Sequence, residues 1–154
     1  MHVSRAVTMF ATISLIGVAC SDDNTTGIPA GLEVYTATLN GANERLTPVS
    51  TSATGTAIVT VLGNQLSWKV DITTAIDSII AGHIHHAPID SAGPVRVNFN
   101  VTATGAGFTG TATQGSVTLT GDSVQTWLHQ GAAYVNIHTK ANTGGEIRGQ
   151  LVRQ

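Results

Sequence analysis

Period-two alternation of apolar and polar residues constrains the fold of this chain more than any other feature of its sequence. The clearest example is the segment Gln65–Thr73, in which Leu66, Trp68, Val70 and Ile72 alternate with polar residues. Successive side chains of a β-strand point to opposite faces, so this pattern predicts a strand with one buried face. The other segments with a similar pattern are Leu32–Asn40, Gly55–Leu62, Ile79–His86, Val95–Val101, Gly115–Thr120, Ala133–His138 and Glu146–Val152.

Turn-forming residues such as Gly63 and Asn64 separate most of the predicted strands. One segment breaks the alternation: Asp122 or Ser123 could cap a short helix that ends at Gly131. Short strands with a single such helix are typical of all-β proteins. We therefore predict an antiparallel Greek-key β-sandwich, or a flattened barrel, of about seven to eight strands with one short helix.

The first 19 residues are typical of a secretion signal. His2 and Arg5 precede an uncharged stretch that is shorter than the roughly 20 apolar residues of a membrane span and ends in small residues. Cys20, the only cysteine, follows directly, where a bacterial lipoprotein signal places its lipidated residue. We expect cleavage of residues 1–19 and a lipid anchor on Cys20. Ordinary cleavage nearby, which leaves a free thiol, is the alternative.

Residues 20–31 are polar and contain glycine and proline, which predicts a tether that leads to a domain over residues 32–154. A signal and a lipidated Cys20 would place the protein at the bacterial cell envelope. Ser21 rather than aspartate follows Cys20, which favours the outer membrane if the cell has one. Loss of Arg5 with the signal leaves six Lys and Arg residues against nine Asp and Glu. The excess of acidic residues does not favour nucleic acid, so we do not expect it to bind. We expect the lipid to attach the protein to a membrane. The sequence leaves open whether an extracytoplasmic protein partner exists.

Three of the six histidines lie in the predicted strand Ile79–His86. Alternation divides its residues between two faces, with Ile80, Gly82, Ile84 and His86 on one and Ile79, Ala81, His83 and His85 on the other. The first face has more branched apolar weight at the centre of the strand, so we predict that it lies in the core. His83 and His85 then point outward on the same side. We expect His86, which precedes Ala87 and Pro88, to satisfy a turn.

A fourth histidine, His138, follows the same logic in the predicted strand Ala133–His138. We assign Val135 and Ile137 to the core, which leaves Tyr134, Asn136 and His138 on the outer face. If the two histidine-bearing strands are near neighbours, His83, His85 and His138 converge on one surface patch.

Three imidazoles on one patch can bind one metal ion. The chain after the predicted signal has no methionine, so soft ligands are scarce and Cu(II) or Zn(II) is favoured over Cu(I). We consider Asn136, Glu146 and Asp90 as residues that orient the ligands. Glu146 could equally pair with Arg148 or Arg96 across strands. His129, in the predicted helix, has no partner that the sequence identifies.

Three motifs in a fixed order resemble the signature of the CHRD domain, the module named after chordin. They are Gly82-His83-Ile84-His85-His86, Tyr134-Val135-Asn136-Ile137-His138-Thr139 and Gly144-Gly145-Glu146-Ile147-Arg148-Gly149-Gln150-Leu151. The resemblance extends over about residues 33 to 152. It implies a fold more than a function, because the biochemical role of the family is poorly defined.

The order of the histidine motifs is also similar to that of the copper-ligand motifs in copper-zinc superoxide dismutases, which are Greek-key sandwiches. On this likeness, His83, His85 and His138 match copper ligands. Residues 87–107 contain no bridging histidine and no histidine-rich zinc loop, and the structural cysteines are missing. The likeness therefore extends to the copper half of such a site and not to the zinc half.

Hydrolase elbows, phosphate-binding glycine loops and paired carboxylates with catalytic spacing are absent from the sequence. We therefore predict an envelope-anchored binding module rather than an enzyme, with copper or zinc as its candidate ligand. The alternative is an extracytoplasmic interaction or structural domain whose histidines only complete hydrogen-bond networks. An enzyme similar to superoxide dismutase is the third hypothesis.

Overall fold

The computed structural model describes residues 29–154, so the predicted signal, Cys20 and most of the tether lie outside the described residues. The described chain forms nine strands and two short helices. The strands are β1 (Leu32–Asn40), β2 (Thr54–Leu62), β3 (Gln65–Ile76), β4 (Ile79–His86), β5 (Val95–Asn98), β6 (Phe108–Thr118), β7 (Ala133–Thr139), β8 (Ile147–Gln150) and β9 (Val152–Arg153). The helices are the 3₁₀ helix η1 (Gly41–Asn43) and α1 (Ser123–His129).

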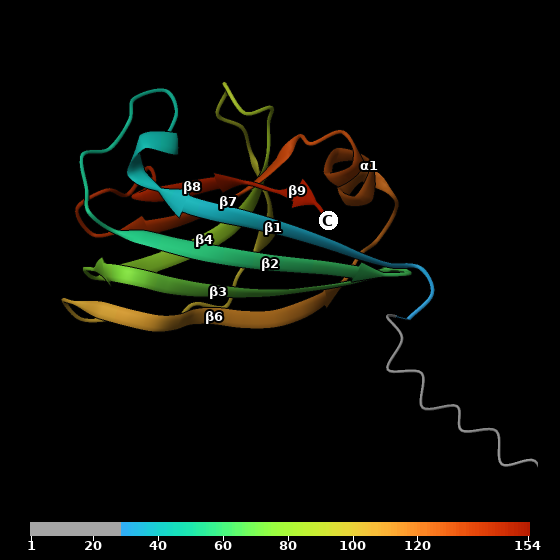
Figure 1. Ribbon diagram of the computed structural model, residues 1–154, viewed down its shortest axis with the longest axis horizontal. Coiled ribbons are helices and arrows are strands. Elements are labelled where there is room, and N and C mark those ends of the chain that lie inside the picture. The colour runs from blue at the N-terminus through green and yellow to red at the C-terminus, as the bar shows by residue number, and fades with distance from the viewer. Residues whose placement is uncertain (1–28) are drawn as a thin grey trace, which may run out of the picture.

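The strands pair in an antiparallel manner in the order β5-β4-β7-β8-β1-β2-β3-β6, and β9 pairs with β1. The sheet curls over itself, so that β4 and β7 lie behind the layer of β1, β2, β3 and β6 (Figure 1). The two layers join where Asn40 of β1 pairs with Arg148 of β8. The predicted all-β sandwich with one short α-helix is therefore confirmed.

The predicted strand Glu146–Val152 divides into β8 and β9, which is one reason why the strands number nine rather than seven to eight. The division falls at Leu151, whose side chain is buried and whose N–H donates to the carbonyl of Ala133. Before this point the chain pairs with β7 and, at Arg148, with the end of β1; after it the chain pairs with β1 at Tyr35 and Thr36.

Strand β6 begins at Phe108, well before the predicted start at Gly115. The added residues are mainly threonine, glycine and alanine and show no apolar alternation. The alternation is missing because β6 is an edge strand whose side chains are mostly exposed. An apolar pattern marks burial, and this strand is held mainly by its backbone pairing with β3.

Strand β3 has the predicted pattern, since Leu66, Trp68, Val70 and Ile72 are all buried. The ring of Trp68 stacks on Phe99 with their centroids 4.8 Å apart.

Polar contacts of Trp68 reach across the gap between β6 and the segment that follows β5. The indole N–H of Trp68 donates to Oγ1 of Thr113 at 3.2 Å. That hydroxyl in turn donates to the carbonyl of Asn100, also at 3.2 Å. Gly115 leaves space for the indole, because a Cβ at this position would lie 2.8 Å from the Trp68 ring. Trp68 therefore connects the two layers where the sheet does not close.

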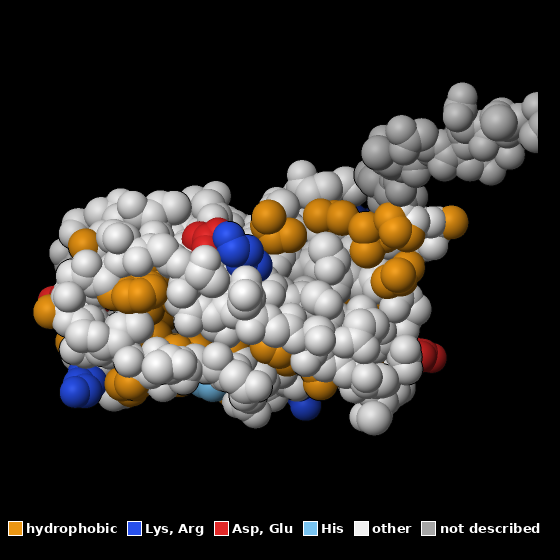
Figure 2. Space-filling view, turned by 90° about the horizontal axis from the view of Figure 1, so that it is seen from below, with side chains coloured by type: hydrophobic (Ala, Val, Ile, Leu, Met, Phe, Trp, Pro, Cys, Tyr) orange, Lys and Arg blue, Asp and Glu red, His pale blue; other side chains and the backbone are white. Residues whose placement is uncertain are grey.

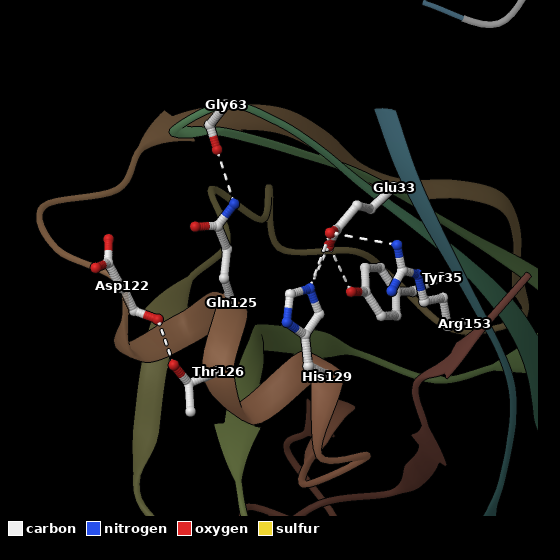
Figure 3. A network of polar contacts seen from close by, with 8 residues as sticks. All are labelled: Glu33, Tyr35, Gly63, Asp122, Gln125, Thr126, His129 and Arg153. Carbon is white, nitrogen blue, oxygen red and sulfur yellow. Dashed lines mark hydrogen bonds and ion pairs between the residues drawn. The ribbon is translucent and has the colours of Figure 1, made fainter. Parts of the chain in front are cut away.

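Helix α1 packs at one end of the sandwich, near the first residues of β1 (Figure 1). Nε2 of His129 lies 2.8 Å from a carboxylate oxygen of Glu33 in β1 (Figure 3). Glu33 also accepts hydrogen bonds from the Tyr35 hydroxyl at 2.7 Å and from Arg153 at 3.4 Å. The partner of His129 is thus a carboxylate from the far end of the sequence, which local patterns could not reveal.

The ends of α1 follow the prediction in part. Gly131 has a left-handed backbone with φ of +65° and donates its N–H to the carbonyl of Leu128, as expected of a helix terminator. The side chain of Asp122 makes no capping hydrogen bond; instead, its carbonyl accepts from Thr126 (Figure 3). Within residues 29–154, no helix combines the length and the apolar character that crossing a membrane requires.

Replacement of Trp68 by alanine should lower the free energy of unfolding by about 3 to 5 kcal/mol, because it removes a buried ring that connects the two layers. Urea denaturation followed by circular dichroism measures this loss. Lys69→Ala is the control, since Lys69 is the next residue on the exposed face and its ion pair with Asp71 is solvent-accessible. A Trp68→Ala loss no larger than that of the control would contradict the assigned core.

Candidate metal site

The pairing of β4 with β7 brings three histidines together. In this register Ala81 pairs with His138 and His83 pairs with Asn136. The ring centroids of His83 and His138 are 4.8 Å apart, those of His83 and His85 are 5.4 Å apart, and those of His85 and His138 are 5.8 Å apart. One ring nitrogen from each lies within 4.8 Å of the others. In the described part of the chain, no other group of three His, Cys, Asp or Glu side chains approaches so closely.

The predicted faces of β4 are wrong at the start of the strand. Ile79 is fully buried and Ile80 is 40% exposed, the reverse of the assignment from alternation. The register of β4 against β7 shifts between Ile79 and Ala81, which indicates a β-bulge. A bulge adds one residue to one strand and reverses the side chains on one side of it. After the bulge, Gly82 and Ile84 are buried as predicted.

His86 also differs from its prediction as a residue that satisfies a turn. Its ring stacks on Trp127 of α1, with the centroids 4.3 Å apart and the planes 15° from parallel. Its backbone N–H does serve the following loop, because it donates to the carbonyl of Pro94.

The predicted outer face of β7, which carries Tyr134, Asn136 and His138, is not a surface patch, because every residue of β7 is buried. His85 and His138 are each only 8% exposed, and His83 is more accessible. Two loops contact the histidines at this face: the one between β4 and β5, which contains Gly93, and the one after β7, which contains Thr143. The three rings do converge on the face opposite the apolar one, as predicted, but the expectation of an exposed patch is wrong, because two of the rings are buried among loops.

Backbone carbonyls from these loops determine which ring nitrogens carry protons. Nδ1 of His85 lies 2.9 Å from the carbonyl of Gly93, and Nδ1 of His138 lies 3.0 Å from the carbonyl of Thr143. A carbonyl only accepts, so each Nδ1 must carry the proton and each Nε2 must present a lone pair. Nδ1 of His83 lies 3.0 Å from Nε2 of His138. Nε2 of His85 is buried and has no hydrogen-bond partner among the described residues.

This arrangement suits a metal ion held by Nε2 of His85, Nε2 of His138 and Nδ1 of His83. Metal–nitrogen bonds of about 2.0 Å in a tetrahedral site place two ligand nitrogens about 3.3 Å apart. The His83 and His138 nitrogens are already 3.0 Å apart. An ion would replace their mutual hydrogen bond, with His83 changing to the tautomer protonated on Nε2, and would give the His85 nitrogen a partner. The carbonyls of Gly93 and Thr143 would orient two of the ligands from behind.

The three imidazoles favour the neutral, ligating form. Burial lowers the pKa of His83 to about 4, and the neighbouring His138 and His85 contribute to this shift. Burial also lowers the pKa values of His85 and His138, although the carbonyls of Gly93 and Thr143 oppose the shift. At neutral pH, protons therefore compete weakly for the lone pairs.

Arg148 supports the loop that holds His85. Arg148 is 2% exposed, and its guanidinium carbon lies 3.5 Å from the centroid of the Tyr134 ring, which in turn stacks on His85 at 4.8 Å. The same guanidinium donates to the carbonyls of Ser91 at 2.8 Å and Pro88 at 3.2 Å. Arg148 thus fixes both the ring beneath His85 and the loop that carries Gly93. The sequence suggested Arg148 only as a partner of Glu146.

The predicted orienting side chains make other contacts. Asn136 donates to Glu44 at 3.4 Å. Glu146 accepts from Thr139 at 2.9 Å and from Asn142, so it braces the loop after β7 rather than pairing with Arg148 or Arg96. Asp90 is exposed and accepts from Ser91. None of the three has a hydrogen bond to the histidines, because backbone carbonyls take that role, and such carbonyls have no residue-type signature.

Glu44, which sequence reasoning missed, is a buried carboxyl beside this site. It is 3% exposed, and burial raises its pKa to about 7, against the opposing effect of the Arg148 charge. Oε1 of Glu44 and Oδ1 of Asn136 are both buried and have no hydrogen-bond partner among the residues that the structure describes. A Cβ on Gly145 would lie 2.7 Å from each of these oxygens, so the two oxygens lie close to each other beside Gly145. A proton on Glu44 would add a donor where two acceptors now meet.

A family model described as the CHRD domain matches residues 35–151. No curated protein and no solved structure matches the chain.

Glu44→Gln should stabilise the protein increasingly as pH rises from about 4.5 to 7. A carboxyl with a raised pKa binds its proton more tightly in the folded state, so wild-type stability falls as the pH rises through this window. Glutamine stays neutral, so the difference in unfolding free energy should grow to at most about 3 kcal/mol. Urea denaturation of both proteins at pH 5 and pH 8 measures it. The buried histidines titrate in both proteins, so their contributions cancel in the difference between the two unfolding free energies. A difference that does not change with pH would show that Glu44 is not a buried carboxyl with a raised pKa.

Proposed function

Because this chain belongs to the CHRD domain family, we propose that its domain is an extracellular binding module that holds one Cu(II) or Zn(II) ion on His83, His85 and His138. One atom supports this proposal more than any other: Nε2 of His85. It is buried, it has no hydrogen-bond partner within residues 29–154, and the carbonyl of Gly93 keeps it deprotonated. A buried acceptor without a partner costs about 1 to 3 kcal/mol, which a metal bond would offset.

The donor set favours Cu(II) or Zn(II). All three candidate ligands are imidazoles, which suit these ions. The cysteine and both methionines of the chain precede residue 29, so no thiolate or thioether of the described domain can select Cu(I). Three protein ligands leave a further position for water or an exchangeable ligand. His83 is the most accessible of the three, so that position would open on its side.

Binding is a better account than dismutase chemistry. Copper-zinc dismutases join a copper site to a zinc site, whereas residues 29–154 bring together only one group of three such ligands. Arg148 is buried and engaged with loop carbonyls. A superoxide assay on the copper-loaded protein tests the enzymatic alternative directly.

The second candidate function is an interaction or structural module without metal. The hydrogen bonds from His85 to Gly93, from His138 to Thr143 and between His83 and His138 favour it, since they stabilise the loops by themselves. Metal titration separates the two candidates.

Wild-type protein without an affinity tag should bind one equivalent of Cu(II), with nitrogen hyperfine structure in the electron paramagnetic resonance spectrum. His83→Ala, His85→Ala and His138→Ala should each weaken binding at least tenfold, because each removes one ligand. His129→Ala is the matched control, since that imidazole lies on α1 and pairs with Glu33. A wild-type dissociation constant weaker than roughly 10 μM, a free energy near −7 kcal/mol, would favour the metal-free module.

The pH dependence of the same titration tests the state of the imidazoles. Free histidine begins to lose metal as pH falls through about 6.5. Burial lowers the pKa values of all three histidines, that of His83 to about 4. Cu(II) affinity should therefore persist below pH 6 and decline as the pH approaches about 4, the pKa of His83. A midpoint at 6.5 or above would show that the rings are solvated.

We also propose that the protein is exported and anchored to the cell envelope by lipid on Cys20. A diacylglyceryl group with a further acyl chain buries enough methylenes, at about 0.8 kcal/mol each, for stable anchoring. Cys20→Ala in the full chain should move the protein from the detergent phase to the aqueous phase in a phase-partition experiment. Unchanged partition of this variant would exclude the anchor.

A further inference from the structure

The curled sheet is open between its terminal strands, β5 and β6, neither of which has a partner on its outer edge. Near α1 this opening contains a cavity of about 460 Å³, bordered by β5, the end of β6 and α1. This volume lies within the range of about 300 to 1,000 Å³ that is typical of small-molecule sites. Figure 2 views the molecule from the side on which β6 lies and shows hydrophobic side chains exposed among polar ones.

The cavity has apolar walls that the protein does not cover. Val97 and Leu119 are buried at its base. Val117 is 38% exposed, although it pairs with the fully buried Leu66 and lies in a strand that borders the core. The exposure arises because no strand follows β6. A ligand with an apolar body would cover this surface favourably.

One charge lines the cavity, and it is positive. Arg96 is the only charged residue of the lining. Its guanidinium carbon lies 4.7 Å from the centroid of the Trp127 ring, which itself stacks on His86. Within residues 29–154, the guanidinium has no ion pair and no hydrogen bond with the protein. Trp127 therefore holds a guanidinium whose planar set of donors remains available to a carboxylate.

We propose that this cavity binds a small amphipathic carboxylate, with the apolar body against Val97, Val117 and Leu119 and the carboxylate on Arg96. The single positive charge selects an anion, and the apolar walls select a hydrocarbon body over a sugar or a free inorganic anion. The hydroxyl of Ser123, which also lines the cavity, can donate to a second carboxylate oxygen. The cavity shares no lining residue with the metal site, so the two proposals are independent.

Titration of the mature protein with sodium octanoate tests this site. The chain has two tryptophans, Trp68 and Trp127, and only Trp127 lines the cavity. In nitrogen–proton correlation spectra, the indole signal of Trp127 should shift and saturate with a dissociation constant below about 1 mM, while that of Trp68 stays in place. Trp127→Phe assigns the two signals. Octanamide, which has the same chain without the charge, should bind at least tenfold more weakly.

Two variants and a control complete the test. Arg96→Gln should weaken octanoate binding at least tenfold, and Val117→Asp should abolish it, because it places a negative charge in the cavity at a partly exposed position. Arg45→Gln, on the loop after η1, should leave binding unchanged. No saturable shift of Trp127 up to 10 mM octanoate, or equal affinity of wild type and Arg96→Gln, would overturn the proposal.

Discussion

The antiparallel pairing of β4 with β7 is the interaction on which both the fold and the candidate site depend. Strand β7 lies between β4 and β8, and both of its faces are buried. One face supplies Val135 and Ile137 to the core. The other carries His138 and lies beside the histidines of β4. A slip of one residue in this pairing would exchange the two faces, so the burial of the apolar pair also determines where the imidazoles meet.

Burial of the polar face requires that its groups find partners, and these partners are loops. A buried polar group without a hydrogen bond is costly, and a buried charge is more so. Arg148 meets this requirement with the carbonyls of Ser91 and Pro88 and with the ring of Tyr134. The loops held in this way supply the carbonyls that select the tautomers of His85 and His138. Nε2 of His85 has no hydrogen-bond partner in the described part of the chain, which makes it the most informative atom of the site.

The open edge of the sandwich between β5 and β6 has the reverse character, because the sheet ends there without closing. Its edges, β5 and β6, are connected through the Trp68, Thr113 and Asn100 contacts rather than through a backbone ladder. Incomplete closure leaves apolar side chains exposed beside a single arginine. The domain therefore has two candidate ligand sites of different chemistry, a nitrogen-rich cluster under loops and an apolar cavity with one cation.

Several features of the protein follow from the sequence alone, because they depend on local patterns. Alternation in Gln65–Thr73 predicts the buried face of β3, and the ordered motifs around His83 and His138 predict the family and the fold class. The tertiary structure decides what alternation cannot encode: the bulge at Ile80, the loops over β7, the burial of Glu44 and the two carbonyls that orient the imidazoles. Periodicity reports which face of an isolated strand is apolar. Register shifts, covering loops and backbone acceptors arise only from how distant segments pair and pack, so they become visible only in the folded chain.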